Sequence, residues 1–492
     1  MTKTIRVLFL AAEAEPFIKV GGLADVAGSL PLALRGLAGS GRTDFKLDLR
    51  LVLPQHRALQ SGSATLRPVA EFPVYRKGRS LPARVSKAVY KGMTVYFING
   101  QPFSSAEGVY SPDLAQDREK YGFFSLAAVE LTRYLDWRVD ILHANDWHTA
   151  LALYALRSRR KNPEFAHLRT ILTLHNLPYM GGDGSDVLAA YGLKPVEDDS
   201  LPDWARNQPL PLGLWSADAI IPVSPTYARE ILTSDYGCGL EAYLQGRAES
   251  ITGILNGLDI DSWNPESDRS LTATFTVDTL SERAMNKNAL QKQLGLPVEP
   301  HTPLFAMISR VDPQKGVDLT LKALPQLGDQ PWQFVLLGAG VAALEEAARL
   351  FQTKFPERAR VVTRYDSNLS RAIYGGADAF LMPSRYEPCG LAQMIAMRYG
   401  CVPIVRTTGG LKDTVQEGRT GFLFEKPAAE AMAEAVARAL TIYASPAKWR
   451  RFQRNGMKED FSWPRSALQY ALIYRSLIPD ARFQGPTERG AI

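Results

Sequence analysis

Short apolar segments rich in β-branched residues alternate along this 492-residue chain with longer stretches of helical periodicity. Apolar segments that lack polar alternation are typical of strands in parallel sheets that helices cover on both faces. The pattern therefore predicts an α/β fold class. A first series of strands is expected at residues 5–11, 141–144, 170–174, 219–223 and 251–255, and a second series at 304–308, 333–337, 360–363, 379–382 and 402–405.

The series of strands is interrupted between residues 256 and 302, where polar residues and the turn-forming pair Asn256-Gly257 replace the apolar segments. A chain of this length exceeds what one hydrophobic core can organise, so at least two domains are expected. Each domain should be doubly wound and Rossmann-like, and the ligand-binding edges should face each other across a deep cleft. The predicted parts are a first domain at 1–255, a second at 256–465, a helix crossing back to the first at 466–480, and a disordered tail at 481–492.

Composition and charge narrow the class of protein. No apolar run is long enough to span a bilayer, and the run 7–12 lacks a cleavage pattern, so we expect a strand there and not a signal peptide. The three cysteines form no CxxC pair, which indicates neither a zinc site nor a disulfide framework and favours the cytoplasm. The formal charge of +6 comes without a dense basic run, so neither a nucleic-acid partner nor a membrane partner is expected. No feature indicates the oligomeric state.

A glycine motif, Lys19-Val20-Gly21-Gly22, follows the first predicted strand. Two adjacent glycines let the backbone approach a ligand closely and expose its N–H groups. The N-terminus of the helix that follows favours phosphate, and Lys19 adds a positive charge. An ordinary turn fits the pattern equally well, because the motif is neither a Walker loop nor a dinucleotide fingerprint.

Three of the six histidines lie at the expected ends of neighbouring strands. His143, Asp146 and His148 could form a metal site, but adjacent residues at a strand end point in different directions. Structural roles for His143 and His148 are therefore favoured over metal binding. His175 is the better functional candidate, because its loop should lie at the ligand-binding edge of the sheet.

In the second half of the chain, Arg310 and Lys315 follow the first predicted strand. A guanidinium fork and an ammonium point charge together suit a diphosphate, although two solvated cations on a loop are an equal alternative. Glu387 follows a later strand and is placed to accept hydrogen bonds from sugar hydroxyls. Two further pairs lie where strands lead into helices and could bind phosphate: Gly390-Leu391 and Thr408-Gly409.

This ordered set of motifs resembles that of bacterial glycogen synthases and plant starch synthases over nearly the whole chain, and Lys19-x-Gly-Gly-Leu narrows the resemblance to that family. The resemblance implies a GT-B fold and a retaining transferase that uses ADP-glucose as donor and an α-1,4-glucan as acceptor, without a metal or another cofactor. Catalytic roles are implied for Glu387, His175, Asp146, Arg310 and Lys315, and substrate binding for Lys19, Gly22, Asn256, Gly390, Leu391, Thr408 and Gly409. Whether Glu387 acts as nucleophile or as hydroxyl anchor stays open.

The sequence departs from the family pattern at three places: Cys238 stands where an aromatic residue is usual, and the other two departures lie beside these motifs. Ala392 stands where a threonine is usual, and Asn145 stands before Asp146 where a histidine is commoner. Two alternative functions remain. One is a related retaining glucosyltransferase with a small acceptor such as glucose 1-phosphate, and the other is a non-catalytic glucan-binding protein on the same fold. The presence of both phosphate cations together with the glutamate favours an enzyme.

Overall fold

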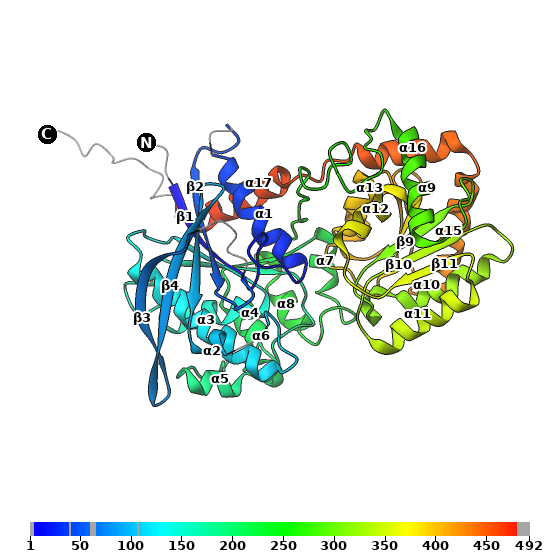
Figure 1. Ribbon diagram of the computed structural model, residues 1–492. Coiled ribbons are helices and arrows are strands. Elements are labelled where there is room, and N and C mark those ends of the chain that lie inside the picture. Colours follow the sequence, from blue (N-terminus) through cyan, green and yellow to red (C-terminus); the bar gives the residue numbers. More distant parts are fainter. Residues whose placement is uncertain (1–3, 39–40, 60–64, 106–107, 480–492) are drawn as a thin grey trace. The chain divides into compact units, whose positions relative to one another are not determined.

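The computed structural model describes residues 4–38, 41–59, 65–105 and 108–479 and divides into two compact units (Figure 1). The first unit joins Met1–Gly257 to Trp463–Ile492, and the second is Leu258–Ser462. The boundaries thus follow Gly257 and Ser462, where the sequence analysis placed them after residues 255 and 465. Gly257 stays with the first unit because it packs tightly on Trp463, where an added Cβ would lie 2.6 Å from the Trp463 Cα atom. The predicted tail 481–492 lies outside the described residues.

The first unit is built on an eight-stranded sheet with the order β3-β4-β5-β2-β1-β6-β7-β8 in the described part of the chain. The six strands from β5 to β8 in this order run parallel, but β4 runs antiparallel to both β3 and β5. The sheet is therefore mixed, which corrects the expectation of a purely parallel one. Its strands are β1 (Thr4–Leu10), β2 (Lys46–Pro54), β3 (Arg67–Arg76), β4 (Arg79–Tyr90), β5 (Met93–Asn99), β6 (Ile141–Asn145), β7 (Arg169–Leu174) and β8 (Ala219–Pro222).

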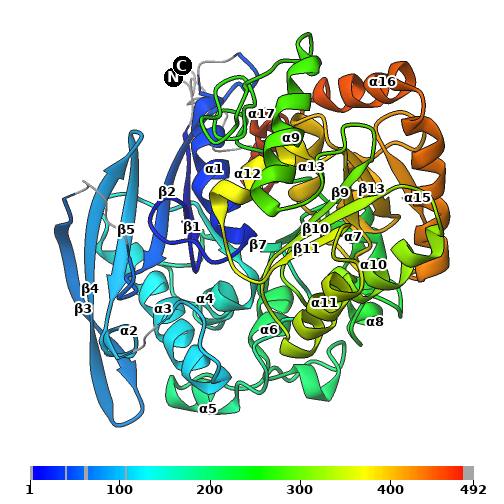
Figure 2. The same cartoon turned by 45° about the vertical axis from the view of Figure 1, so that its right-hand side comes forward.

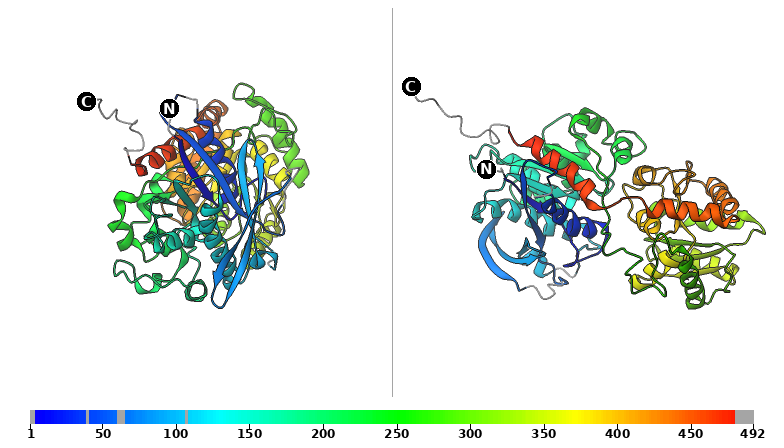
Figure 3. Two further views of the ribbon diagram at one scale, coloured as in Figure 1. Left: turned by 90° about the vertical axis from the view of Figure 1, so that its left-hand side faces the viewer. Right: turned by 90° about the horizontal axis from the view of Figure 1, so that it is seen from above.

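Helices cover both faces of this sheet (Figure 2). On one face, α1 and α17 pack together over the apolar side chains of β1 and β2, and Figure 3 shows α17 in red beside α1 in blue. On the other face, α3, α4 and α6 pack against one another and against β5, β6 and β7. The helices of this unit are α1 (Gly22–Gly36), α2 (Gln101–Ser104), α3 (Leu114–Tyr134), α4 (Asp146–Ser158), α5 (Ser185–Ala190), α6 (Pro209–Ser216), α7 (Pro225–Glu230), α8 (Glu241–Gly246) and α17 (Trp463–Leu477).

The second unit contains a six-stranded parallel sheet with the order β11-β10-β9-β12-β13-β14. Its strands are β9 (Leu304–Ile308), β10 (Gln333–Leu337), β11 (Ala359–Val362), β12 (Ala379–Met382), β13 (Val402–Arg406) and β14 (Phe422–Phe424). Helices α10, α11 and α15 lie on one face, and α9, α12 and α13 on the other (Figure 2). The helices are α9 (Arg283–Leu294), α10 (Val317–Ala323), α11 (Ala342–Lys354), α12 (Ser367–Gly376), α13 (Ala392–Arg398), α14 (Gly409–Thr414), α15 (Ala429–Tyr443) and α16 (Pro446–Met457).

The predicted strands coincide with observed ones within a residue or two, with one exception. Residues 251–255 form only an isolated bridge, from Ile251 to Ile220 beside β8, so the strand predicted there is wrong. None of the described helices has the length and apolar character needed to cross a bilayer. In both units, the residues singled out by the sequence analysis, apart from Asn256, follow the carboxyl ends of strands, which is where doubly wound sheets bind ligands.

Candidate active site

Lys315 and Glu387 form a largely buried ion pair at the carboxyl ends of β9 and β12. The Lys315 Nζ atom lies 2.9 and 2.7 Å from the two carboxylate oxygens of Glu387. The hydroxyl of Ser384 donates to one of these oxygens over 2.9 Å, and Glu387 is only 5% exposed. A carboxylate that has lost its hydration needs such partners. Both residues were predicted as catalytic candidates, and the structure places them in direct contact.

The backbone that carries Lys315 is held by two local features. Lys315 ends a short 3-10 helix, Pro313–Lys315, whose first turn is capped because the Asp312 carboxylate accepts the Lys315 N–H over 3.1 Å. Gly316 follows with φ +71°, and an added Cβ there would lie 2.3 Å from the Pro383 carbonyl oxygen. This close approach presses the Lys315 turn against the segment that follows β12 and leads to Glu387.

Arg310 occupies a different environment from Lys315. Its guanidinium lies 2.8 Å from the Asp312 carboxylate and donates to the Gln314 side chain over 3.2 Å, and its side chain is 57% exposed. The two cations therefore lie on the same turn, as expected, but each is matched to a carboxylate of its own. Asp312 serves this turn twice, as the cap of the 3-10 helix and as the ion-pair partner of Arg310.

A cavity of about 100 Å³ opens beside the ion pair within the second unit. Gly390, at φ +73°, has its α-carbon so close to Gln393 that an added Cβ would lie 2.5 Å from the Gln393 side-chain oxygen. Helix α13 begins at Ala392, as predicted, directly after Leu391. The cavity is lined in part by residues that contribute polar side chains or backbone. They include Ser309, Lys315, Ser384, Glu387, Gly390 and Leu391.

Thr408 and Gly409 pack behind Glu387. Thr408 is fully buried at the start of α14, and the Gly410 N–H donates to the Glu387 carbonyl oxygen over 3.1 Å. Gly409 has φ +44°, and an added Cβ there would lie 1.9 Å from that same carbonyl oxygen. The structure thus gives Gly409 a clear packing role, namely to let the start of α14 approach the Glu387 backbone.

In the first unit, Lys19 is engaged by two carboxylates. Its Nζ atom lies 2.9 Å from Glu15 and 2.6 Å from Asp25. Burial raises the pKa of Asp25 to about 6, although the charge of Lys19 lowers it. Gly22, the first residue of α1, follows three positions after Lys19 and is exposed.

The backbone of the glycine motif is hydrogen-bonded to the side chain of Glu13, which is 1% exposed. Its carboxylate accepts the N–H of Val20 over 2.5 Å, the N–H of Gly21 over 3.0 Å and the hydroxyl of Tyr110 over 3.0 Å. The expectation that both adjacent glycines expose their N–H groups to a ligand is therefore wrong for Gly21, because Glu13 already takes that donor. Burial raises the pKa of Glu13, against the lowering effect of these hydrogen bonds.

Asp146 and His175 lie together where β6 and β7 end. Asp146 has φ +52° and accepts the backbone N–H of His175 over 2.7 Å and that of Asn176 over 3.3 Å. Burial raises the pKa of Asp146 to about 7, although these two hydrogen bonds lower it, and burial lowers the pKa of His175 to about 3. The imidazole Nε2 atom lies 3.0 Å from the side-chain oxygen of Asn145. The site thus holds His175 with a neutral imidazole. Asn145, the last residue of β6, contacts its ring, and Asp146, the first residue of α4, accepts its backbone N–H.

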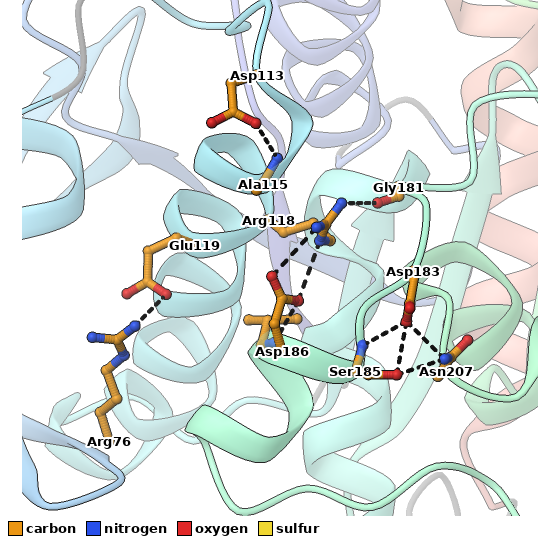
Figure 4. A network of polar contacts seen from close by, with 11 residues as sticks. Arg76, Asp113, Ala115, Arg118, Glu119, Gly181, Asp183, Ser185, Asp186 and Asn207 are labelled. Atoms are coloured by element: carbon orange, nitrogen blue, oxygen red, sulfur yellow. Dashed lines mark hydrogen bonds and ion pairs between the residues drawn. The ribbon is translucent and has the colours of Figure 1, made fainter.

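The loop that follows His175 is fastened to α3 and α5 by a polar network (Figure 4). The Arg118 guanidinium reaches the Asp186 carboxylate over 3.3 Å and the Gly181 carbonyl over 3.4 Å. The Asn207 amide donates to Asp183 and to the Ser185 hydroxyl, over 2.7 Å in each case. These contacts restrain the course of the chain immediately beyond His175.

Asn256 lies at the end of the first unit and is 6% exposed. Its side-chain oxygen is buried and has no hydrogen-bond partner among the described residues. A buried polar atom of this kind is unusual in a folded protein and is a feature of sites that await a ligand or water.

The metal alternative finds no support at the residues proposed for it. His143 is buried between Tyr474, 2.8 Å from its Nδ1 atom, and Thr173, 2.7 Å from its Nε2 atom. His148 is packed against the rings of Trp147 and Tyr121. In the described ranges, no group of three or more His, Cys, Asp or Glu side chains is placed to hold a metal ion. His143 thus links β6 to α17 through Tyr474.

Comparison with known proteins places this geometry in a family. Residues 6–246 match the model of the starch synthase catalytic domain, and residues 287–456 match that of glycosyl transferases group 1. The chain is 40% identical to a glycogen synthase of Aromatoleum aromaticum over 96% of both chains, and 39% identical to one of Thermotoga petrophila over 96% of this chain and 99% of the other. The chain belongs to the glycogen synthase and starch synthase family.

Solved structures agree with the membership in the glycogen synthase and starch synthase family. The catalytic domain of starch synthase IV from Arabidopsis thaliana, solved with ADP and acarbose, is 32% identical, with a TM-score of 0.85 over 97% of this chain and 99% of the other. A sucrose-phosphate synthase from Thermosynechococcus elongatus shares the fold at 19% identity, with a TM-score of 0.60 over 96% of this chain and 99% of the other. The GT-B fold with two Rossmann-like units, the family and the glycosyltransferase class predicted from the sequence are confirmed.

Three residues that contact or support the motifs in this chain were not among the predicted site residues. Glu13 and Tyr110 support the glycine motif, and Asn145 contacts His175. A signal for Glu13 was present, because a carboxylate that directly follows a buried strand and two alanines is seldom left without partners. Tyr110 carried no such signal, since its position depends on how a distant loop folds back.

Proposed function

We propose that this chain transfers glucose from ADP-glucose to the non-reducing end of an α-1,4-glucan, with retention of the anomeric configuration. The observation that carries the proposal is the Lys315–Glu387 pair beside a small cavity at the ligand-binding edge of the second sheet. The ADP and acarbose bound to the starch synthase IV relative support a nucleotide donor and a glucan-like acceptor.

The chemistry requires stabilisation of a leaving diphosphate. When the glycosyl–phosphate bond breaks, negative charge develops on the diphosphate and positive charge on the sugar ring. Lys315 and Arg310 would compensate the former, because both lie on the turn after β9. We assign binding of the glucose hydroxyls to Glu387 and contacts with the donor phosphates to Gly390, Leu391, Thr408 and Gly409.

The first unit contributes the remaining candidates. We propose that Lys19 and Gly22 bind donor phosphate, that His175 and Asp146 lie at the reacting sugar, and that Asn256 binds the sugar through its unpartnered oxygen. Because Lys315 and Arg310 supply positive charge, we propose that transfer needs no metal ion or other cofactor. The three cysteines, which are all free, support a cytoplasmic location.

Transfer of labelled glucose tests the proposal. ADP-glucose and UDP-glucose are each offered with glycogen, maltose and glucose 1-phosphate, with and without EDTA. Label should enter glycogen from ADP-glucose, and EDTA should not reduce the rate. Transfer only to glucose 1-phosphate would support a small-acceptor enzyme instead. Binding of glycogen without transfer from either donor would support a glucan-binding protein, and a requirement for added Mn²⁺ would contradict the metal-free mechanism.

A further inference from the structure

Asn145 joins two strands of the first sheet to the ring of His175. It is fully buried as the last residue of β6. Its amide nitrogen donates to the Leu10 carbonyl at the end of β1 over 2.9 Å, and its amide oxygen lies 3.0 Å from the Nε2 atom of His175. Asn145 occupies the position where the sequence analysis noted a departure from the histidine commoner in the family.

The Leu10 carbonyl fixes which way the Asn145 amide faces. A carbonyl oxygen only accepts hydrogen bonds, so the amide NH₂ must face Leu10 and the amide oxygen must face His175. An amide oxygen also only accepts, so the hydrogen between it and His175 has to belong to the imidazole. A neutral imidazole carries one ring hydrogen, which leaves Nδ1 as an acceptor. In the part of the chain that the structure describes, no hydrogen bond to His175 Nδ1 is found.

We propose that Asn145 is a positioning residue that fixes His175 in the Nε2–H tautomer, so that the ring presents an unprotonated Nδ1 to a hydroxyl of the substrate. The tautomer follows from geometry alone, and only the identity of the hydroxyl as a sugar hydroxyl rests on the proposed function. Asp146 completes the arrangement, because it holds the His175 backbone N–H while its neighbour Asn145 holds the ring. A histidine oriented by the group on its far nitrogen is a common device for setting the role of the near one.

Nuclear magnetic resonance of protein labelled with ¹⁵N-histidine tests the tautomer directly. Long-range ¹H–¹⁵N spectra report which ring nitrogen carries the hydrogen, and His175→Gln identifies the His175 signals. We expect the Nε2–H form from pH 6 to pH 8 in the unaltered chain and loss of this preference in Asn145→Ala. The signals of His143, which is held by Tyr474 and Thr173, should stay unchanged as an internal control. An Nδ1–H form in the unaltered chain, or the same tautomer preference in Asn145→Ala, would overturn the proposal.

Steady-state kinetics of glucose transfer test whether the orientation of His175 affects the reaction. Asn145→Ala should lower kcat by about 10- to 100-fold, the usual cost of removing the partner of an oriented histidine, with little change in the KM for glycogen. Asn145→Asp keeps the shape but places a negative charge at Nε2, which favours the imidazolium form. Its rate should therefore rise with pH more steeply than that of the unaltered chain. A kcat for Asn145→Ala equal to that of the unaltered chain would overturn the proposal.

Two controls show whether the effects of the Asn145 variants arise from a folding defect. The tautomer measurement, in addition, does not depend on the proposed function. Asn162→Ala removes an exposed amide that contacts only Glu164 and should leave both the spectra and the rate unchanged. Thermal midpoints of both Asn145 variants show whether the folded state persists, and Asn145→Asp is the variant that best preserves the shape. If the unaltered chain transfers no glucose at all, the proposed function fails, while the tautomer measurement still decides the inference.

Discussion

The candidate sites of the two units hold their polar groups in opposite electrostatic states. At the edge of the second sheet, charges are matched in pairs, Lys315 with Glu387 and Arg310 with Asp312. At the ends of β6 and β7 in the first unit, burial favours neutral forms, because it raises the pKa of Asp146 to about 7 and lowers that of His175 to about 3. The edge of the second sheet thus provides charge, and the ends of β6 and β7 provide oriented hydrogen-bonding groups.

This difference fits the two tasks of a glycosyl transfer. A leaving diphosphate needs cations, and a diphosphate can take over cations that carboxylates hold in its absence. A sugar needs hydrogen-bond partners of fixed direction, for which a neutral imidazole with a defined tautomer is well suited. Substitutions of the charged groups at the second sheet should therefore change the transfer rate most, and those at the ends of β6 and β7 should also change the pH dependence.

The largest effect is expected for Lys315→Ala. Loss of the cation should lower kcat/KM by about 10²- to 10⁴-fold in the glucose-transfer assay. It should also lower the free energy of unfolding in urea by about 3 kcal/mol, because Glu387 would stay buried without its partner. A rate equal to that of the unaltered chain would show that the diphosphate binds elsewhere.

Combining Lys315→Ala with Glu387→Gln separates the two effects. The neutral amide removes the unpaired charge, so stability should recover in part. The rate should stay low, because an amide cannot accept through both ends as a carboxylate does. Recovery of the rate in the double variant would mean that Lys315 serves only to neutralise Glu387. Glu387→Gln alone should also lose much of the rate, and full activity would remove Glu387 from the site.

Arg310→Ala should produce the second largest change in rate, about 10²-fold, but without a loss of stability. Its side chain is 57% exposed, and exposed ion pairs contribute little to folding. Arg349→Ala is a matched control, because Arg349 is also an exposed arginine paired with carboxylates, on α11 of the same unit. Equal rates for the two variants would contradict the role of Arg310 at the diphosphate.

Asp146→Asn should alter the pH dependence of stability. The folded-state pKa of Asp146 is raised from 3.8 to about 7, so between these values the folded chain binds a proton more tightly than the unfolded chain does. This contribution to stability is present below pH 4 and is lost as the pH rises to 7, by at most about 4 kcal/mol. Asparagine tolerates the positive φ and can accept the same N–H groups.

Urea unfolding of the unaltered chain and of Asp146→Asn, each at pH 4 and at pH 7, measures this effect. The difference between the two proteins isolates Asp146, because Asp25 and the other carboxylates are common to both. The unaltered chain should lose more stability between these pH values than Asp146→Asn. Parallel pH profiles would contradict a raised pKa for Asp146.

The smallest effect is expected for Gly409→Ala. Comparison with Gly418→Ala distinguishes the loss of stability caused by backbone strain from that caused by close packing. Gly409→Ala and Gly418→Ala both place a side chain at positive φ, and both should lose about 1 kcal/mol for that reason. Only at Gly409 does the added Cβ meet the Glu387 carbonyl, so a further loss of about 1–3 kcal/mol and a lower rate are expected. Equal thermal midpoints for the two variants would show that the start of α14 can move away from Glu387.

Most of the parallel strands could be predicted closely because they are buried on both faces, although the parallel strands β2 and β5 were missed. Strands β9, β10 and β12 were predicted with their observed bounds, since uninterrupted apolar runs such as Leu304–Ile308 end abruptly in polar loops. Strands β3 and β4 were missed, because they alternate buried and exposed residues at the edge of the sheet and contain prolines. β14 was missed because it has only three residues, Phe422–Phe424.

The candidate site could be predicted as a set of residues but not as a set of contacts. The resemblance located Lys315 and Glu387, yet their ion pair joins residues 72 positions apart and depends on how Gly316 packs against Pro383. The amide contact from Asn145 to His175 likewise requires the register of β6 against β1 and β7. Such contacts arise from the fold, so no local pattern contains them.

Incorporation of labelled glucose from ADP-glucose into glycogen, followed by β-amylase digestion, tests the central claim most directly. β-Amylase releases maltose from the non-reducing ends of α-1,4-linked chains. The proposed function predicts that the label, incorporated in the presence of EDTA, is released as maltose, and that Lys315→Ala incorporates about 10²- to 10⁴-fold less. Label that resists β-amylase, or that stays in small products and never enters glycogen, would contradict it.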